Sequence, residues 1–221
     1  MRTAILLGFS LSITSLASAD PLIEKAASLS TDGTLYAYEM TFKTSDMTTT
    51  GKIDPSAPEG KRITVYTPVK EDWPEDFEKG LANMDKNTTG DIWCKEFADL
   101  VPLDAKQVAE TDESMTFTFN PEPPEDADGM EKKLMKKLEA EITLAKEDGA
   151  VLNYSAILPK PYKPAMVAKI NTFRMSATCE RAPDGRTYMQ KFDFEIDGSA
   201  MMQDFSETTS RTITKLLGPV G

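Results

Sequence analysis

The stretch KLEAEITLAKEDGAVLNYSAILPK, residues 137–160, decides the fold. Its apolar residues alternate with charged or polar ones: Leu138, Ala140, Ile142 and Leu144 precede a turn, and Leu152, Tyr154, Ala156 and Leu158 follow it. Alternation with a period of two puts one set of side chains on each face of a sheet. Asp148-Gly149 can supply the positive φ of a tight hairpin turn. The stretch therefore predicts a β-hairpin with one apolar face.

The same alternation continues towards the C-terminus. Residues 172–180 (TFRMSATCE) and 188–197 (YMQKFDFEID) each place aromatic, Met or small side chains on one parity and polar ones on the other. Pro183-Asp184-Gly185 is a turn tripeptide between them. Residues 201–213 then predict a largely polar edge strand, and the tail from Gly218 is expected to fray. From Lys137 to Lys215 the sequence predicts an antiparallel meander.

The N-terminal half predicts shorter strands mixed with helices. Strands are expected over 34–42, 47–54, 61–67, 106–110 and 115–120, and helices over 21–30, 77–84, 93–101 and 130–138. The fold class is therefore α+β, mainly antiparallel β. Strands of about ten residues span roughly 30 Å, and a large antiparallel sheet tends to curl. We expect a curled, half-open β-barrel with two or three short helices covering its concave face.

The first nineteen residues have the features of a secretory signal peptide. Arg2 is followed by a mostly apolar run, and Ala17-Ser18-Ala19 is a small-x-small cleavage site. The apolar run is too short to favour the alternative, a membrane anchor. We expect cleavage after Ala19, leaving residues 20–221 as a single soluble, exported domain.

Composition argues against several functions. The net charge is −11, and phosphate contact needs Lys and Arg, so we expect no nucleic-acid binding. Histidine is absent, which removes the commonest general base and imidazole metal ligands. Asp126 and Asp128 beside Gly129 do not match a calcium loop, because the glycine falls at the wrong position. We expect no enzymatic activity, no metal and no cofactor.

Two cysteines, Cys94 and Cys179, leave two interpretations open. In an oxidising compartment they could form a disulfide. Alternatively, they are two buried thiols that behave as small hydrophobic side chains. Their separation matches neither a metal site nor a CxxC redox motif.

Methionine and aromatic residues recur on the apolar parity of several strands. Methionine fills irregular space and suits surfaces that accept varied apolar ligands. Two or three short helices would not fill a large curled sheet, and the remaining space would form a pocket. The candidate ligand-binding residues are Tyr36, Tyr38, Met40, Phe42, Phe173, Met175, Phe192 and Phe194. The alternative for each is an ordinary sheet core.

Three segments resemble the LolA/LolB superfamily of periplasmic lipoprotein-carrier-like proteins. They are residues 36–42 (YAYEMTF), 51–67 (GKIDPSAPEGKRITVYT) and 150–176, and residues 159–168 and 198–205 are similar to an uncharacterised subgroup. The resemblance implies a half-open β-barrel capped by helices, a periplasmic location and binding of lipid or lipoprotein acyl chains. No cysteine lies near the cleavage site, so the likeness is to the soluble carrier.

Three functional hypotheses follow. The first is a monomeric carrier or sensor of an apolar ligand, with transient membrane or envelope-protein contact and with the helices at 77–84 and 93–100 as a lid. The second is a protein-interaction or envelope-stress module that uses an exposed edge strand at Ser206–Ile213. The third is a hydrolase based on carboxylates or a Ser/Lys pair, which the absence of histidine disfavours.

Overall fold

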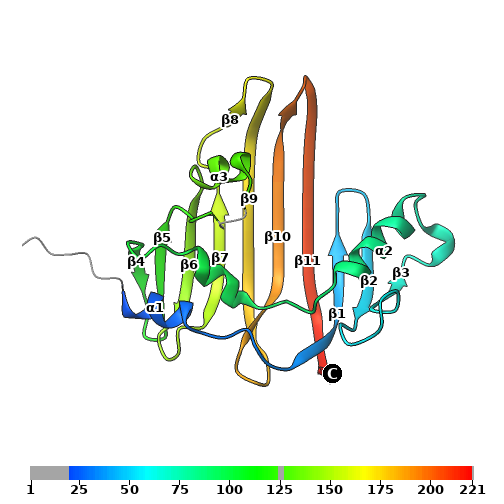
Figure 1. Cartoon of the computed structure of the whole chain (residues 1–221), viewed down its shortest axis with the longest axis horizontal. Coiled ribbons are helices and arrows are strands. Elements are labelled where there is room, and N and C mark those ends of the chain that lie inside the picture. Colours follow the sequence, from blue (N-terminus) through cyan, green and yellow to red (C-terminus); the bar gives the residue numbers. More distant parts are fainter. Residues whose placement is uncertain (1–19, 124–126, 221) are drawn as a thin grey trace, which may run out of the picture.

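A computed structural model describes residues 20–123 and 127–220 (Figure 1). The expected signal peptide and Asp126 lie outside this range. Eleven strands are present: β1 (Leu35–Lys43), β2 (Thr48–Ile53), β3 (Ile63–Thr67), β4 (Lys106–Glu110), β5 (Ser114–Phe119), β6 (Glu139–Ala145), β7 (Val151–Ile157), β8 (Tyr162–Ala165), β9 (Ala168–Arg181), β10 (Thr187–Ala200) and β11 (Gln203–Val220). The predicted mainly antiparallel α+β class is confirmed.

All strands belong to one antiparallel sheet. Its spatial order is β3-β2-β1-β11-β10-β9-β7-β6-β5-β4, and β8 pairs with part of β9. The N-terminal hairpins and the C-terminal meander meet where β1 pairs with β11. This junction brings Phe42 beside Arg211, which are distant in sequence.

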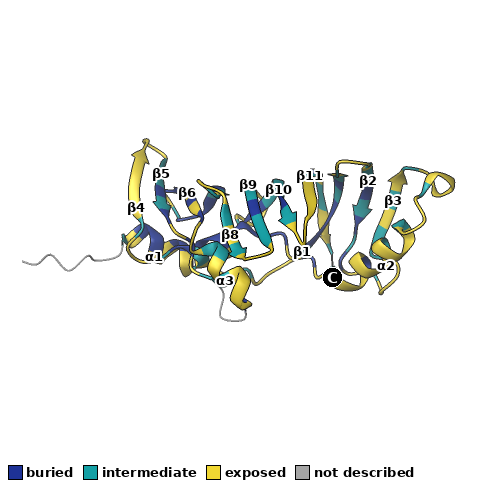
Figure 2. Cartoon of the chain, turned by 90° about the horizontal axis from the view of Figure 1, so that it is seen from above, coloured by how far each residue is buried: buried dark blue, intermediate teal, exposed yellow. Residues whose placement is uncertain are grey.

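The helices lie on one face of the sheet, which we call the covered face, as the view from above shows (Figure 2). They are α1 (Pro21–Ala27), α2 (Phe77–Asn87) and α3 (Gly129–Met135), with short 3-10 helices η1 (Lys70–Asp72) and η2 (Cys94–Leu100). Asp20 caps α1 by accepting a hydrogen bond from the Leu22 amide at 2.8 Å. The Asp128 carboxylate caps α3 in the same way, as expected for a helix start rather than a calcium ligand.

Two separate hydrophobic cores bury the covered face. In the larger core, α1 and η2 pack on β5, β6, β7 and β9, and Phe97 stacks on Tyr154 with ring centroids 4.4 Å apart. In the smaller core, Tyr36, Tyr38 and Met40 of β1 surround Trp93 and Tyr188. Between and above these cores the covered face is only half-buried.

The expected curl into a half-open barrel is not confirmed. The sheet is open, with β3 and β4 at its two ends, and Figure 2 shows it crossing the molecule as a broad layer. The larger core lies beneath α1 and η2, and the smaller core lies beneath Ile92 and Trp93, so the covered face is buried locally and the sheet does not need to close.

The predicted edge strand at Ser206–Ile213 is wrong in part. β11 is an inner strand, and residues 210–212 pair with both β1 and β10. Only Gln203–Thr209 has β10 on one side and no described strand on the other. The tail was also expected to fray, but β11 continues to Val220 because Pro219 pairs with Tyr36.

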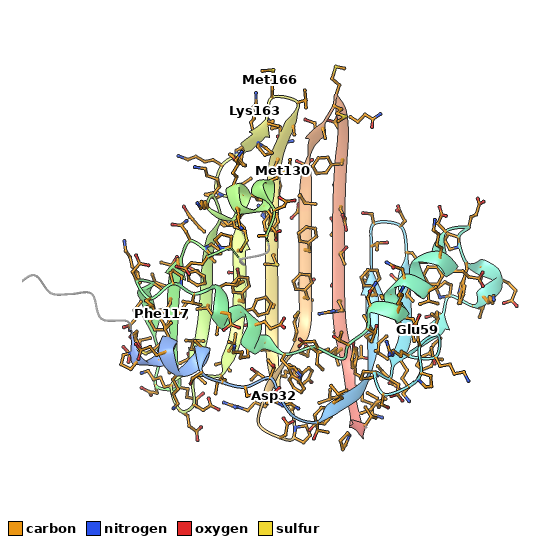
Figure 3. The ribbon with its side chains drawn as sticks, in the orientation of Figure 1. Asp32, Glu59, Phe117, Met130, Lys163 and Met166 are labelled. Carbon is orange, nitrogen blue, oxygen red and sulfur yellow. A yellow bond between two sulfur atoms is a disulfide. The ribbon has the colours of Figure 1, made fainter. Side chains whose placement is uncertain are left out.

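The hairpins at the far end of β9 to β11 present exposed apolar side chains. Met166 and Met202 are fully exposed, and Met166 stands at this end of the molecule (Figure 3). The Met201 amide donates to the Val167 carbonyl at 2.8 Å, which ties the two hairpins together.

Candidate ligand-binding site

Residues that pair directly from strand to strand form one row across the covered face. Starting from β2, it contains Thr49, Phe42, Arg211, Phe192, Ala177, Tyr154, Ile142 and Phe117. Directly paired residues in an antiparallel sheet project to the same face. The row is apolar at its β5 end, where it enters the larger core, and carries polar side chains where β2 and β11 flank β1.

The eight residues singled out from the sequence share this face but do not form one site. Tyr36 and Tyr38 are buried in the smaller core and act there as packing residues. Phe173, Met175 and Phe194 are half-buried on the upper part of β9 and β10, where Phe173 meets Phe194 edge to face at 5.5 Å. Met40, Phe42 and Phe192 line two cavities near β1.

The first cavity, the α2 pocket, lies between α2 and strands β1 to β3. Its volume is about 330 Å³, within the range of small-molecule sites. It is lined by Met40, Phe42, Met47, Thr49, Gly51, Ile53, Ile63, Val65, Asp76, Phe77, Gly80, Leu81 and Met84. The roof is the apolar stripe of α2, in which Phe77, Leu81 and Met84 recur at helical spacing.

This roof is loosely packed. Phe77 and Leu81 are only half-buried, Met84 is 41% exposed, and Asp85 is the one buried residue of the helix. A Cβ atom added at Gly80 would meet no atom within 4 Å. The apolar side of α2 therefore covers a space that protein atoms do not fill.

Polar contacts hold α2 mainly at its C-terminal end. The buried Asp85 carboxylate accepts hydrogen bonds from the Gly60 amide and, at 2.9 Å, from the Ile63 amide. The Arg62 guanidinium donates to the carbonyls of Asp85, Lys86 and Thr88. Near the other end, the Lys70–Glu78 ion pair is largely exposed. Buried hydrogen bonds thus fix the C-terminal end, whereas an exposed ion pair and the edge-to-face contact of Phe77 with Trp73, at 4.9 Å, hold the N-terminal end.

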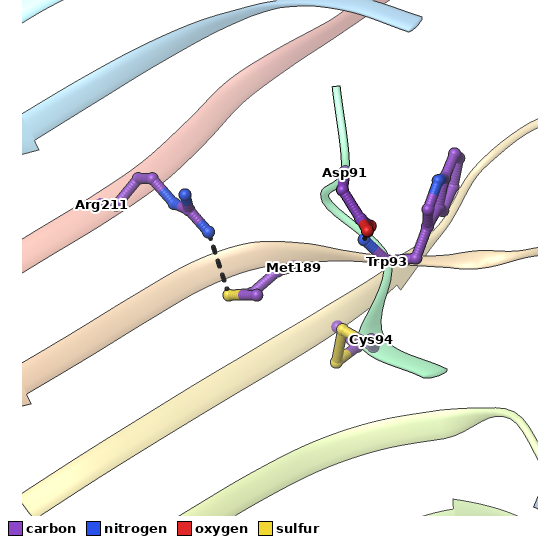
Figure 4. Close-up of a disulfide and its surroundings, with 6 residues drawn as sticks. Asp91, Trp93, Cys94, Met189 and Arg211 are labelled. Carbon is purple, nitrogen blue, oxygen red and sulfur yellow. Dashed lines mark hydrogen bonds between the residues drawn. A yellow bond between two sulfur atoms is a disulfide. The ribbon is translucent and has the colours of Figure 1, made fainter. Parts of the chain in front are cut away.

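The second cavity, the Arg211 pocket, has a volume of about 360 Å³ and shares the Phe42 side chain with the α2 pocket. Its lining is aromatic and charged, with Phe42, Trp93, Glu96, Phe97, Met189, Phe192, Thr209 and Arg211. The Arg211 Nη2 atom lies 3.2 Å from the Met189 sulfur (Figure 4), and its guanidinium is 5.9 Å from the Phe192 ring centroid.

Two pKa shifts describe the electrostatics near Arg211. Burial raises the pKa of Tyr38, and the positive charge of Arg211 partly opposes that rise. Burial, followed by a hydrogen bond and repulsion from Asp91, raises the pKa of Glu96 from 4.5 to about 7. Glu96 is therefore partly protonated at neutral pH.

A disulfide fixes the floor of the larger core beside the Arg211 pocket. The Cys94 and Cys179 sulfur atoms are 1.99 Å apart and join η2 to β9 (Figure 4). Of the two interpretations of the cysteines, the structure has the disulfide. Neighbouring Trp93 forms a β-bridge with Tyr188, and the Arg186 guanidinium lies over its indole ring at 3.6 Å. These links hold η2 firmly on the sheet, in contrast to α2.

Sequence reasoning found part of these pockets and missed the rest. Met40 and Phe42 follow from the alternation of β1, and the apolar stripe of α2 from helical spacing. Arg211 was missed, although it lies two residues before buried Ile213 in the same strand. An arginine on the buried parity of a strand is the signal that could have identified it.

Comparisons with protein-family models, curated proteins and solved structures find no match to this chain. The resemblance to the LolA/LolB superfamily therefore stays a prediction. Within residues 20–123 and 127–220, no helix is long and apolar enough to cross a membrane. The same residues contain no group of three or more Cys, Asp or Glu side chains placed to hold a metal ion.

Proposed function

We propose that this chain is an exported, non-enzymatic protein that reversibly binds an apolar ligand in the α2 pocket, as a carrier or sensor. The ligand class is a lipid or an acyl chain, including the acyl chains of a lipoprotein. The observation that carries the proposal is a mainly apolar cavity beneath a helix whose apolar stripe is only half-buried.

The size of the pocket sets the scale of the interaction. Burying one methylene contributes about 0.8 kcal/mol. Each buried segment of about four methylenes would thus contribute roughly 3 kcal/mol. Phe42 and Phe192 lead from the pocket along the covered face, where Met175 and Phe194 are half-buried. We infer that a longer chain follows this path.

Helix α2 is the lid in this proposal. Asp85 and Arg62 fasten its C-terminal end to the β2–β3 hairpin, so that end serves as the hinge. The exposed Lys70–Glu78 ion pair offers little resistance to opening at the other end. Bound ligand would then replace the missing protein contacts of Phe77 and Leu81.

The cellular setting of the proposal is the periplasm. The Cys94–Cys179 disulfide supports an oxidising compartment and agrees with the signal-peptide features of residues 1–19. We infer a monomer that contacts a membrane or an envelope protein transiently, and the exposed Met166 and Met202 favour such contact. A half-open, LolA-like barrel remains our proposal for how the sheet would enclose a large ligand.

Filling the cavity tests the proposal. Gly80→Leu adds a side chain at a position with open space and improves helix propensity by about 1 kcal/mol, so the fold should be retained. Calorimetric titration with dodecanol should show an affinity about ten-fold lower than that of wild type. The matched control is Ala82→Leu, on the same helix but outside the pocket lining, which should bind as wild type does. Equal affinity in both variants would remove the α2 pocket from the site.

One observation favours a second candidate, a protein-interaction module. Residues Gln203–Thr209 of β11 have one side unpaired by any described strand, and an extended peptide could add there. Thr208→Lys places a lysine opposite Glu195, which preserves the β10 pairing and blocks strand addition. If ligand-free protein captures an envelope partner and Thr208→Lys abolishes the capture, this second function gains support over the carrier.

A further inference from the structure

Two buried polar atoms lack a hydrogen-bond partner in the part of the chain that the structure describes. They are the Thr49 hydroxyl oxygen and the Arg211 Nε atom. Buried polar atoms are nearly always paired, so each exception needs an explanation. Both residues pair with Phe42, one on each side of it, in the row that crosses β2, β1 and β11. The two exceptions therefore fall at one place, where the α2 pocket and the Arg211 pocket meet.

Arg211 differs from the other arginines between residues 20 and 220. Arg174, Arg181 and Arg186 form ion pairs with Glu195, Asp148 and Asp184. Arg62 instead donates to several backbone carbonyls.

For Arg211, no described carboxylate lies within ion-pair distance, and the described contacts of its guanidinium are a sulfur atom and an aromatic ring. In a chain with a net charge of −11, an arginine without an acidic partner on the apolar face is conspicuous.

We propose that the Arg211 pocket binds the anionic head group, a carboxylate or phosphate, of an amphiphile whose acyl chain occupies the α2 pocket. This inference rests on the proposed function and specifies its ligand. Arginine presents a planar set of donors that matches carboxylate and phosphate oxygens. Phe42 is half-buried between the pockets, so its rotation would open Arg211 and the Thr49 hydroxyl to one bound molecule.

Glu96 also lines the Arg211 pocket, and its raised pKa reduces the negative charge that it brings there. Because its pKa is raised to about 7, this carboxyl is only partly ionised at neutral pH. A hydrogen bond with Asp91 is one cause of this rise, so the proton lies between these two carboxyl groups. The pocket thus offers a permanent cation and the Thr209 hydroxyl around an aromatic wall.

The test compares dodecanoate with dodecanol, which share a chain and differ in the head group. Calorimetric titration of the wild-type chain should give at least about a ten-fold higher affinity for dodecanoate, as expected for hydrogen bonds to a charged group. Arg211→Gln should abolish this preference and leave the dodecanol affinity within about two-fold. The control Arg174→Gln removes an exposed arginine from the opposite face and should keep the preference.

The outcomes separate this inference from the proposed function. Binding of both probes with equal affinity overturns the head-group site and leaves the apolar pocket standing. Binding of neither overturns the proposed function itself. Inorganic phosphate that binds at the same site with an affinity independent of any chain would show a free-anion site instead of an amphiphile site.

A second variant tests the Thr49 hydroxyl while keeping the shape of the side chain. Thr49→Val removes a hydroxyl that has no partner in the ligand-free protein, so the Tm should be unchanged or higher. The dodecanoate affinity should fall about three-fold or more if the hydroxyl contacts the head group. A lower Tm with unchanged affinity would assign Thr49 a structural role and exclude it from the site.

Discussion

At the residue scale, the sequence predicts which face of the sheet most of the site's side chains occupy, but it does not predict the role of Arg211. Met40 and Phe42 follow from the alternation in β1 and lie on the cavity wall. Tyr36 and Tyr38 share that alternation, yet Trp93 and Tyr188 cover them. Alternation fixes the face of a residue but not what packs on that face, which depends on segments distant in sequence. Arg211 was missed for the same reason, since its aromatic neighbours come from other strands.

Glu96 gives a prediction at this scale. Because its pKa is raised from 4.5 to about 7, the folded protein holds this proton more tightly than the unfolded chain does. Its contribution to the free energy of unfolding is fully present below pH 4.5 and is lost as the pH rises through about 7. Glu96 is exposed in part, so screening reduces the effect to about 1 kcal/mol.

Glu96→Gln should therefore lose less stability than wild type between about pH 5 and about pH 8. Chemical denaturation at both pH values measures this difference, with the exposed Glu131→Gln on α3 as a control. Identical pH profiles for Glu96→Gln and wild type would contradict the raised pKa of Glu96.

At the element scale, most strands follow from local pattern. The expected strand at 106–110 agrees with β4 at both ends, and those at 138–144 and 152–158 differ from β6 and β7 by one residue. β8 contains Pro164, which cannot donate a backbone hydrogen bond, and it pairs with β9 at only two positions. The C-terminal part of β11 was missed because Gly218-Pro219 suggests an end, whereas pairing with β1 carries the strand further.

The β10–β11 turn carries a second prediction at this scale. Met201 and Met202 have φ values of 51° and 66°, and they alone among the described non-glycine residues have positive φ. Such a backbone costs roughly 1–2 kcal/mol per L-residue, and Asn-Gly tolerates it best. The double variant Met201→Asn, Met202→Gly should raise the free energy of unfolding by about 1–2 kcal/mol in chemical denaturation.

Met166 in the neighbouring hairpin is the matched control for this turn. It is as exposed as Met202 but is not among the residues with positive φ. Met166→Asn should leave the free energy of unfolding unchanged. A gain of the same size from Met166→Asn would show that loss of exposed apolar surface, rather than backbone strain, is responsible.

At the scale of the whole molecule, strand order and curvature could not be predicted. The pairing of β1 with β11 joins segments about as far apart as the chain allows, and no local pattern indicates which strands meet. The open sheet has a similar cause, because the two separate cores depend on where η2 and the preceding residues Ile92 and Trp93 pack. The mainly antiparallel class was predictable because it needs only the alternation and the turns.

The disulfide supplies a prediction at this scale, because it joins η2 to β9 across 85 residues. Closing a loop of that size stabilises the folded state by about 4–5 kcal/mol in the chain-entropy model. The double variant Cys94→Ala, Cys179→Ala should lose stability of that order in chemical denaturation. Wild-type protein in reductant should match it. A loss below about 1 kcal/mol in both would contradict the account of η2 as an element anchored by the bridge.

The central claim is that an apolar ligand occupies the α2 pocket. Its most direct test is native mass spectrometry of residues 20–221, exported through residues 1–19 and purified without detergent. We predict a co-purifying mass that dissociates as a lipid, present in wild type and Ala82→Leu and depleted in Gly80→Leu. A clean mass for wild type, unchanged after incubation with envelope lipids, would contradict the claim.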